Sequence, residues 1–238
     1  MPSHLTFDDF SPATLTCELR YKSSYLLFDR TGQILEELRG SFTDINTVIG
    51  TPQQTTFASA QGTVVLELGA CRFTTGELEK GVESFARLSK SFFDAVTTQL
   101  EISSFARIGL RYILRKEFKN ASDSKAALAA MNLPNLKSAK RFNISEGPAE
   151  ILFRWEDTQI GASVRLKTET LEIKINAPPE FRAHLPIVDK KVAVLTLDTD
   201  YYTVASVDRD QWDAQEWVLQ KIRIIRKEVD DILQGGGK

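Results

Sequence analysis

One segment alternates polar and apolar side chains, and it constrains the fold more than any other feature of the chain. Between Phe105 and Phe118 the pattern repeats with a period of two. Ile108, Leu110, Tyr112 and Leu114 fall on one side, and Arg107, Gly109, Arg111, Ile113 and Arg115 fall on the other. Successive side chains of a β-strand point to opposite faces. The pattern therefore predicts a long strand with one buried face and one face rich in arginine.

Several other segments alternate in the same way, or are β-branched and bounded by turn residues. We predict strands over residues 13–21, 63–68 and 71–75, and over residues 141–145, 149–156, 160–167, 170–176 and 191–202. Gly147 with Pro148, Asp157 with Thr158, and Glu169 supply the predicted turns of the later group. This spacing is typical of an antiparallel meander.

Two long segments have apolar residues at steps of three and four, which is typical of amphipathic helices. The first covers residues 77–99, and the second runs to Leu233 from an N-cap at Asp210 or Asp213. A short helix capped by Ser122 or Asp123 is predicted over residues 122–131, and a weaker one over 33–42. Hairpin-like strands with segregated helices indicate an α+β fold, with antiparallel sheets packed against the two long helices.

The best boundary within the chain falls at residues 133–140, after the short helix. We expect an N-terminal α+β half, residues 1–132, and a C-terminal half, residues 133–238, that consists of an antiparallel sheet and a long helix. Because the connecting segment is short, the two halves should pack against each other.

Charge and cysteine usage limit the partners and the compartment. Thirty basic and 32 acidic residues give a formal net charge of −2, which argues against dedicated nucleic-acid binding. The N-terminus lacks the features of a secretory signal, and no apolar run approaches the ~20 residues of a membrane span. Cys17 and Cys71 have no spacing motif, so we expect buried thiols in a reducing compartment. A cytoplasmic protein that does not bind membranes is the expectation.

Most catalytic and metal-binding chemistry lacks its residues here. The chain has only two histidines, and it contains no phosphate-binding glycine loop, no HExxH and no Cys-x-x-Cys. We interpret His184, in a proline-flanked loop, as an exposed residue and not a catalytic base. We therefore expect no cofactor, no metal site and no catalytic residue, and an enzyme is the less favoured class.

The arginines of residues 105–118 form the most suggestive group. Arg107, Arg111 and Arg115 share one face of a strand, with successive members about 13 Å apart, and Gly109 leaves room beside them for a ligand or a backbone. Guanidinium groups suit carboxylates and phosphates, so this face could dock an anionic ligand or an acidic protein. The alternative is that the arginines form ion pairs within the sheet, with Glu67, Asp198 or Asp200 as partners.

Asp198 and Asp200 form a second candidate pair at the end of the strand at 191–202. Carboxylates two residues apart on a strand share a face, so both could bind one cation or flank one substrate. The alternative is a solvated strand end, or salt bridges to arginines.

Two segments resemble a sporadically distributed family of uncharacterised bacterial proteins. Residues 107–113, Arg-Ile-Gly-Leu-Arg-Tyr-Ile, are similar to the R-[IL]-G-L-R-Y-I motif of that family, and residues 197–201 are similar to its late Asp-x-Asp strand before a long C-terminal helix. Leu114 stands where the family usually has Asn. The family brings no established activity, but the resemblance implies that Arg107, Gly109, Arg111 and Tyr112 form a structural signature that joins the two halves.

These observations favour a non-enzymatic binding or protein-interaction module, with a protein partner or an anionic ligand at the arginine face. A first alternative is a small-molecule binder, because an antiparallel sheet curved around a long C-terminal helix can enclose an apolar cavity. A second alternative is a metal-dependent enzyme that acts on phosphate esters through Asp198 and Asp200.

Overall fold

The computed structural model describes residues 5–51, 53–76, 78, 81–131, 149–174 and 189–234. The first half contains η1 (Phe7–Asp9), β1 (Ser11–Arg20), α1 (Leu27–Leu38), β2 (Asn46–Gly50), β3 (Gln54–Ser59), β4 (Gly62–Glu67), β5 (Ala70–Thr75), α2 (Gly81–Gln99), β6 (Ser104–Phe105), β7 (Arg107–Phe118) and α3 (Ala121–Ala130). The second half contains β8 (Glu150–Glu156), β9 (Ile160–Lys174), β10 (Asp189–Thr203), β11 (Val207–Asp208), η3 (Arg209–Gln211) and α5 (Ala214–Leu233).

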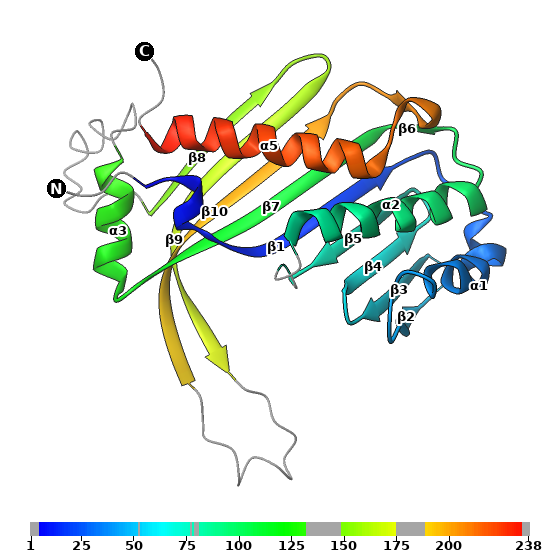
Figure 1. Ribbon diagram of the computed structural model, residues 1–238, viewed down its shortest axis with the longest axis horizontal. Helices are drawn as coiled ribbons and strands as arrows, with labels where there is room; N and C mark the ends of the chain where they lie inside the picture. The colour runs from blue at the N-terminus through cyan, green and yellow to red at the C-terminus, as the bar shows by residue number, and fades with distance from the viewer. Residues whose placement is uncertain are drawn as a thin grey trace, which may run out of the picture.

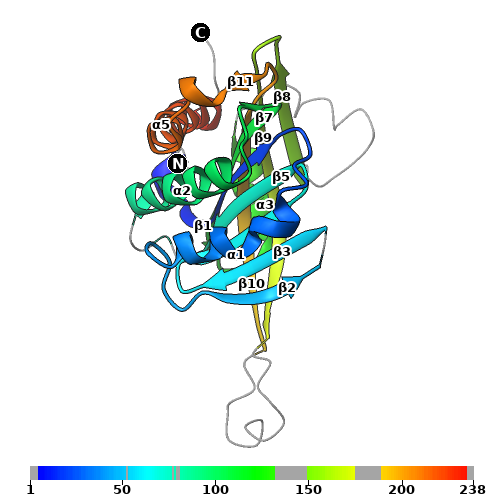
Figure 2. The same cartoon turned by 90° about the vertical axis from the view of Figure 1, so that its right-hand side faces the viewer.

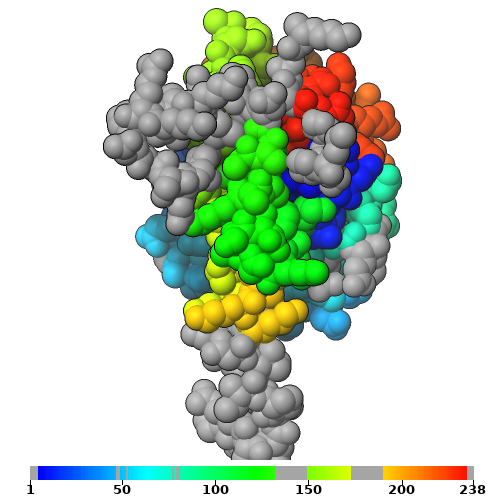
Figure 3. All heavy atoms as spheres, turned by 90° about the vertical axis from the view of Figure 1, so that its left-hand side faces the viewer, coloured from blue at the N-terminus to red at the C-terminus, as the bar shows by residue number. Residues whose placement is uncertain are grey.

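Nine of the strands form one antiparallel sheet in the order β2-β3-β4-β5-β1-β7-β10-β9-β8 (Figure 1). The helices α2 and α5 pack against each other on one side of this sheet, as Figure 2 shows, and α1 packs on α2. The α+β class with antiparallel strands and long amphipathic helices is therefore confirmed. Figure 3 shows α3, in green, at the centre of the face that lies on the left of Figure 1, and α3 contacts β7, β9 and β10.

The sheet continues from the first half of the chain into the second. β7 belongs to the first half and pairs with β10 of the second, from the Phe118–Ala193 pair to the Gly109–Tyr202 pair. The boundary that we predict at residues 133–140 lies outside the described residues, as do the strand predicted at 141–145 and His184.

The core lies between the sheet and the helices, and aromatic side chains fill its centre. Phe73 of β5 is fully buried, with its ring centroid 5.3 Å from that of Phe42 and 5.1 Å from that of Phe85 on α2. Cys17 and Cys71 are both buried and free, as expected, and burial raises the pKa of both thiols. Neither thiol is therefore disposed to act as a nucleophile.

The second half departs from the predicted meander at Glu169. The sequence analysis places a turn there, but β9 is one continuous strand whose residues 160–174 all pair with β10. Glu169 lies opposite Val194, and its carboxylate accepts a hydrogen bond from Thr196 Oγ1 at 2.6 Å. The prediction was wrong because a run of polar residues on a half-exposed strand has the composition of a turn.

Two helix starts also differ from prediction. The helix α1 begins at Leu27, six residues before the predicted start, and its N-cap residue Leu26 has no capping side chain that the sequence could reveal. The helix α3 is capped by Asn120, whose side chain accepts a hydrogen bond from the Asp123 N–H, and not by Ser122 or Asp123. The cap of α5 is Asp213, one of the two predicted residues.

Candidate functional site

The arginines of β7 lie on the face of the sheet opposite α2 and α5, which we call the open face. The register places β7 between β1 and β10, and the predicted alternation of residues 107–115 is present. Ile108, Leu110, Tyr112 and Leu114 are buried beneath the helices. On the open face, the Arg111 side chain is 53% exposed.

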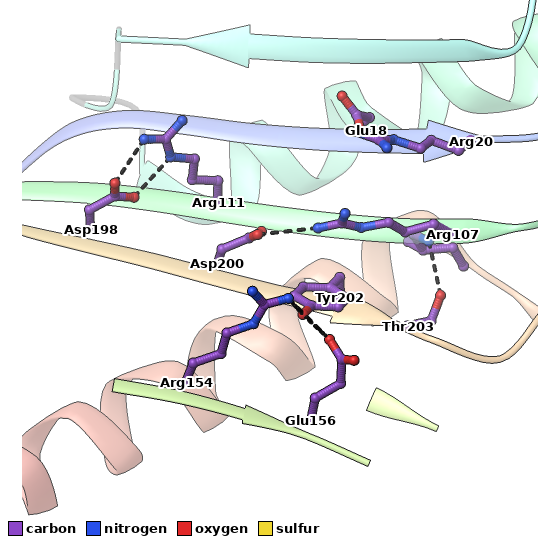
Figure 4. A network of polar contacts seen from close by, with 11 residues as sticks. Glu18, Arg20, Arg107, Arg111, Arg154, Glu156, Asp198, Asp200, Tyr202 and Thr203 are labelled. Carbon is purple, nitrogen blue, oxygen red and sulfur yellow. Dashed lines mark hydrogen bonds and ion pairs between the residues drawn. The ribbon is translucent and has the colours of Figure 1, made fainter. Parts of the chain in front are cut away.

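Arg111 is held by a neighbouring carboxylate. Its Nε and Nη2 donate to the two carboxylate oxygens of Asp198 at 2.8 and 2.7 Å, in the bidentate geometry that Figure 4 shows. Asp198 is only 15% exposed, so the arginine covers it. The hydrogen bonds that Arg111 donates to Asp198 raise the pKa of the guanidinium above its usual value. This is the within-sheet ion pair that the sequence left as an alternative.

Arg107 makes a looser arrangement one step along the strand. Its Nη2 donates to Asp200 Oδ2 at 3.2 Å, and its Cζ lies 4.0 Å from the centroid of the Tyr202 ring. Burial raises the pKa of Asp200, although Arg107 and Arg111 oppose this effect. The Arg107 guanidinium therefore interacts with both a carboxylate and the face of an aromatic ring.

Gly161 makes room for the Tyr202 ring. A Cβ at Gly161 would lie 2.3 Å from the Tyr202 ring, so the ring lies directly on this glycine. The Tyr202 hydroxyl donates to Glu156, and Arg154 donates to that hydroxyl (Figure 4). Gly109 is covered by Arg107 and Tyr202, so the space that the sequence suggested for a ligand is filled by this protein's own side chains.

Arg115 and Tyr112, the remaining predicted residues of β7, lie in different surroundings. Arg115 is half-buried, and its charge influences the carboxylate of Glu169. Burial alone would raise the pKa of Glu169, but the Thr196 hydroxyl, Lys167 and Arg115 together lower it. Tyr112 lies on the helix side, 3% exposed, with its ring edge against Phe7. The structure thus brings Arg107, Arg111, Asp198 and Asp200 together on one face but leaves Tyr112 on the other.

The ion pairs limit what this face can do. Asp198 and Asp200 already accept hydrogen bonds from arginines, so an incoming cation or anion would have to displace a partner that is in place. Within the described part of the chain, no group of three or more His, Cys, Asp or Glu side chains is arranged to hold a metal ion.

The helix side of the sheet carries a groove that, unlike the arginine face, offers open space for a ligand. It lies between the C-terminal part of α5 and strands β8, β9 and β10, and has a volume of about 1130 Å³. Its apolar walls are contributed by Trp155, Ile160, Ala162, Val164, Tyr201, Ile224, Ile225, Val229 and Ile232. Trp155 is 50% exposed and Ile160 39% exposed, so large apolar surfaces remain open to solvent at its edge. Pockets for small molecules are typically apolar and of this order of size.

The charged groups at the groove are unevenly distributed. Glu228 and Asp231, both exposed on α5, contribute to its lining. Lys221 lies about two turns before Glu228 on α5. Its Nζ is 5.0 Å from the centroid of the Tyr201 ring, and burial lowers its pKa. The C-terminal end of the groove is therefore acidic.

The sequence analysis suggested a cavity between the last helix and the sheet but named none of these residues. The signal was the apolar stripe of α5, which continues to its last turn through Ile225, Val229 and Ile232. Residues at steps of three and four share one helix face. Ile232 on this face and Ile224 beside it are only half-buried, so the sheet covers the apolar side of the helix in part.

Compared with known proteins, the chain matches no family model and no curated protein. None of the helices in the described ranges is long and apolar enough to cross a membrane.

Proposed function

We propose that the protein is a non-enzymatic binding protein that holds a small amphipathic molecule in the groove between α5 and strands β8–β10. The observation that carries this proposal is the groove itself, because about 1130 Å³ of largely apolar space stays open between α5 and the sheet. Apolar surface of this extent gains free energy when a ligand covers it, at roughly 25 cal/mol per Å².

The charges suggest the class of ligand. Glu228 and Asp231 make the C-terminal end of the groove acidic, so a carboxylate or phosphate headgroup would be repelled there. A neutral or cationic headgroup on an apolar body fits both the walls and the charged end. The ligand class is therefore a neutral or cationic amphiphile.

The arginines of β7 on the open face support a docking function less strongly than the groove supports ligand binding. Arg111 is half exposed and could meet an acidic partner, but two of its three guanidinium nitrogens, Nε and Nη2, already donate to Asp198. Docking would replace one ion pair by another of similar strength, with little net gain. An enzyme acting on phosphate esters would similarly need Asp198 and Asp200 to leave their arginines.

A steric block of the groove tests the proposal. Ala162 lies among its lining residues, so Ala162→Phe should fill it, and we expect the affinity for dodecyltrimethylammonium below its micelle concentration to fall at least about tenfold, roughly 1.4 kcal/mol. Isothermal titration calorimetry gives this affinity directly.

Ala58→Phe is the matched control, because Ala58 is a half-buried strand alanine on β3, at the far side of the sheet. This variant should bind like the unmodified protein. Equal binding by all three proteins, or no binding by any of them, would contradict the assignment of the groove.

A further inference from the structure

The strand β8 forms one edge of the sheet and is built regularly along its whole length. All seven of its residues pair with β9 without a register shift, and no strand in the described ranges pairs with its outer side (Figure 1). Leu152 is 51% exposed on the open face, and Trp155 is 50% exposed on the other. Exposed edge strands of this kind are templates for pairing with another strand.

The opposite edge of the sheet is protected in a way that β8 is not. The strand β2 has five residues, and its pairing with β3 is interrupted by a register shift between Thr47 and Ile49. A bulge of this type bends an edge strand and blocks regular pairing. The two edges therefore differ, and only β8 presents a regular ladder.

The hydrogen bonds of β8 identify which backbone groups point outward. The Ala149 carbonyl accepts from the Thr168 N–H at 2.8 Å, and the Asp157 N–H donates to the Ile160 carbonyl at 2.9 Å. Along an antiparallel strand, inward-pointing and outward-pointing residues alternate. Glu150, Leu152 and Arg154 consequently direct both their N–H and C=O groups away from β9.

We propose that two copies of this chain pair through β8, antiparallel, about a two-fold axis at Leu152. In this register Leu152 exchanges two backbone hydrogen bonds with its own counterpart, and Glu150 exchanges two with Arg154 of the partner subunit. Each copy thereby places a glutamate beside an arginine of the other, twice per dimer. The two sheets become one continuous sheet.

Charge complementarity favours this register over the one with its two-fold axis at Phe153. A two-fold axis at Phe153 would also satisfy the outward backbone groups, but it would set Glu150 opposite Glu156 and Leu152 opposite Arg154. Like charges directly opposite each other destabilise a strand pair. The axis at Leu152 instead sets the exposed leucines against each other between two ion pairs.

The side chains involved can change partners at little cost. Arg154 is 67% exposed, and it lies 3.4 Å from Glu156 and donates a long hydrogen bond of 3.3 Å to the Tyr202 hydroxyl. Glu150 is 44% exposed and lies 3.5 Å from Arg165. Such loose surface pairs contribute little to stability. On the helix side, Ile151 would meet Phe153 of the partner subunit, so an apolar contact forms below the charged one. The pairing depends on β8 alone and does not require a ligand in the groove.

Charge-swap variants test the pairing by sedimentation equilibrium at micromolar concentration. The unmodified protein should show twice the chain mass of 26.7 kDa. Glu150→Arg sets arginines opposite arginines, and Arg154→Glu sets glutamates opposite glutamates, so each variant alone should be a monomer. A mixture of the two variants should dimerise, because every cross-strand pair is then of opposite charge.

The mixture also shows that both variants are folded. Glu156→Arg is the matched control: it lies on the same strand face, opposite no strand residue in this register, and should leave the dimer unchanged. A monomeric unmodified protein overturns the proposal. Dimers that persist in both single variants, or a mixture that stays monomeric, overturn it as well.

Discussion

Tyr202 lies across Gly161, and this contact fixes the polar network at one end of the open face. The ring contacts the glycine backbone below, the Arg107 guanidinium 4.0 Å away, and Glu156 through its hydroxyl. The hydrogen bond from Tyr202 lowers the pKa of Glu156. Gly161 is therefore needed for packing, because only a glycine leaves space for the Tyr202 ring. From the sequence, a glycine within a strand indicates only that some group approaches closely.

Gly161→Ala should destabilise the protein by about 1–3 kcal/mol, because the new methyl group displaces the Tyr202 ring. Gly32→Ala is the control, since no atom lies within 4 Å of the added methyl group in α1, and it should stabilise the protein by about 0.5–1 kcal/mol. Urea denaturation measures both changes. An equal cost of Gly161→Ala with and without Tyr202→Ala would show that the ring is not the cause.

The sequence predicted which arginines share one face of β7, but not whether these arginines form ion pairs. The alternation of residues 105–118 identified which side chains share a face, because that depends only on the period of a strand. Whether Asp198 would reach Arg111 depends on the register of β10 against β7, which no local pattern encodes. The ion pair could therefore be stated only as one of two alternatives.

Among the elements, α5 is the best predicted, and its N-terminus explains why. The Asp213 carboxylate accepts from the Glu216 N–H at 2.9 Å and lies 2.8 Å from Lys90 of α2. The hydrogen bond from Lys90, and then that from Glu216, lower the pKa of Asp213. A strong cap followed by a regular apolar stripe is readable from sequence. In contrast, α1 has an N-cap leucine, and the predicted range of 33–42 misses its first six residues and extends past its end at Leu38.

Asp213→Ala should cost about 1 kcal/mol at neutral pH, since it removes the cap, whereas Asp213→Asn keeps a capping oxygen and loses only the charge. Because the folded pKa of Asp213 lies below 3.8, the ionised form adds stability above that pH and loses it as the pH falls further. The stability difference between the unmodified protein and the Asp213→Asn variant should therefore vanish in acid.

Thermal unfolding followed by circular dichroism at several pH values gives this difference. Asp210→Ala is the control, because the other predicted cap residue lies in η3 and makes no capping hydrogen bond to α5. A pH-independent gap between the unmodified protein and the Asp213→Asn variant would contradict the assigned role of the charge.

For the whole molecule, the sequence predicted the class of fold but not how its parts join. Each strand and helix could be recognised locally, but the pairing of β7 with β10 arises from contacts far apart in the chain. The groove depends on the same long-range arrangement, because it exists only where α5 leaves part of β8 and β9 uncovered. Local patterns therefore indicated a cavity without naming its walls.

Charge selectivity of the groove is the most direct test of the proposed function. We would measure the affinities of dodecyltrimethylammonium and dodecanoate by calorimetry for the unmodified protein, for Glu228→Lys with Asp231→Lys, and for Glu36→Lys with Glu117→Lys as a control of equal net charge outside the groove. We predict a preference of about tenfold or more for the cation in the unmodified and control proteins, and a reversed preference in the groove variant. The same preference in all three proteins, or binding of neither molecule, would contradict the account.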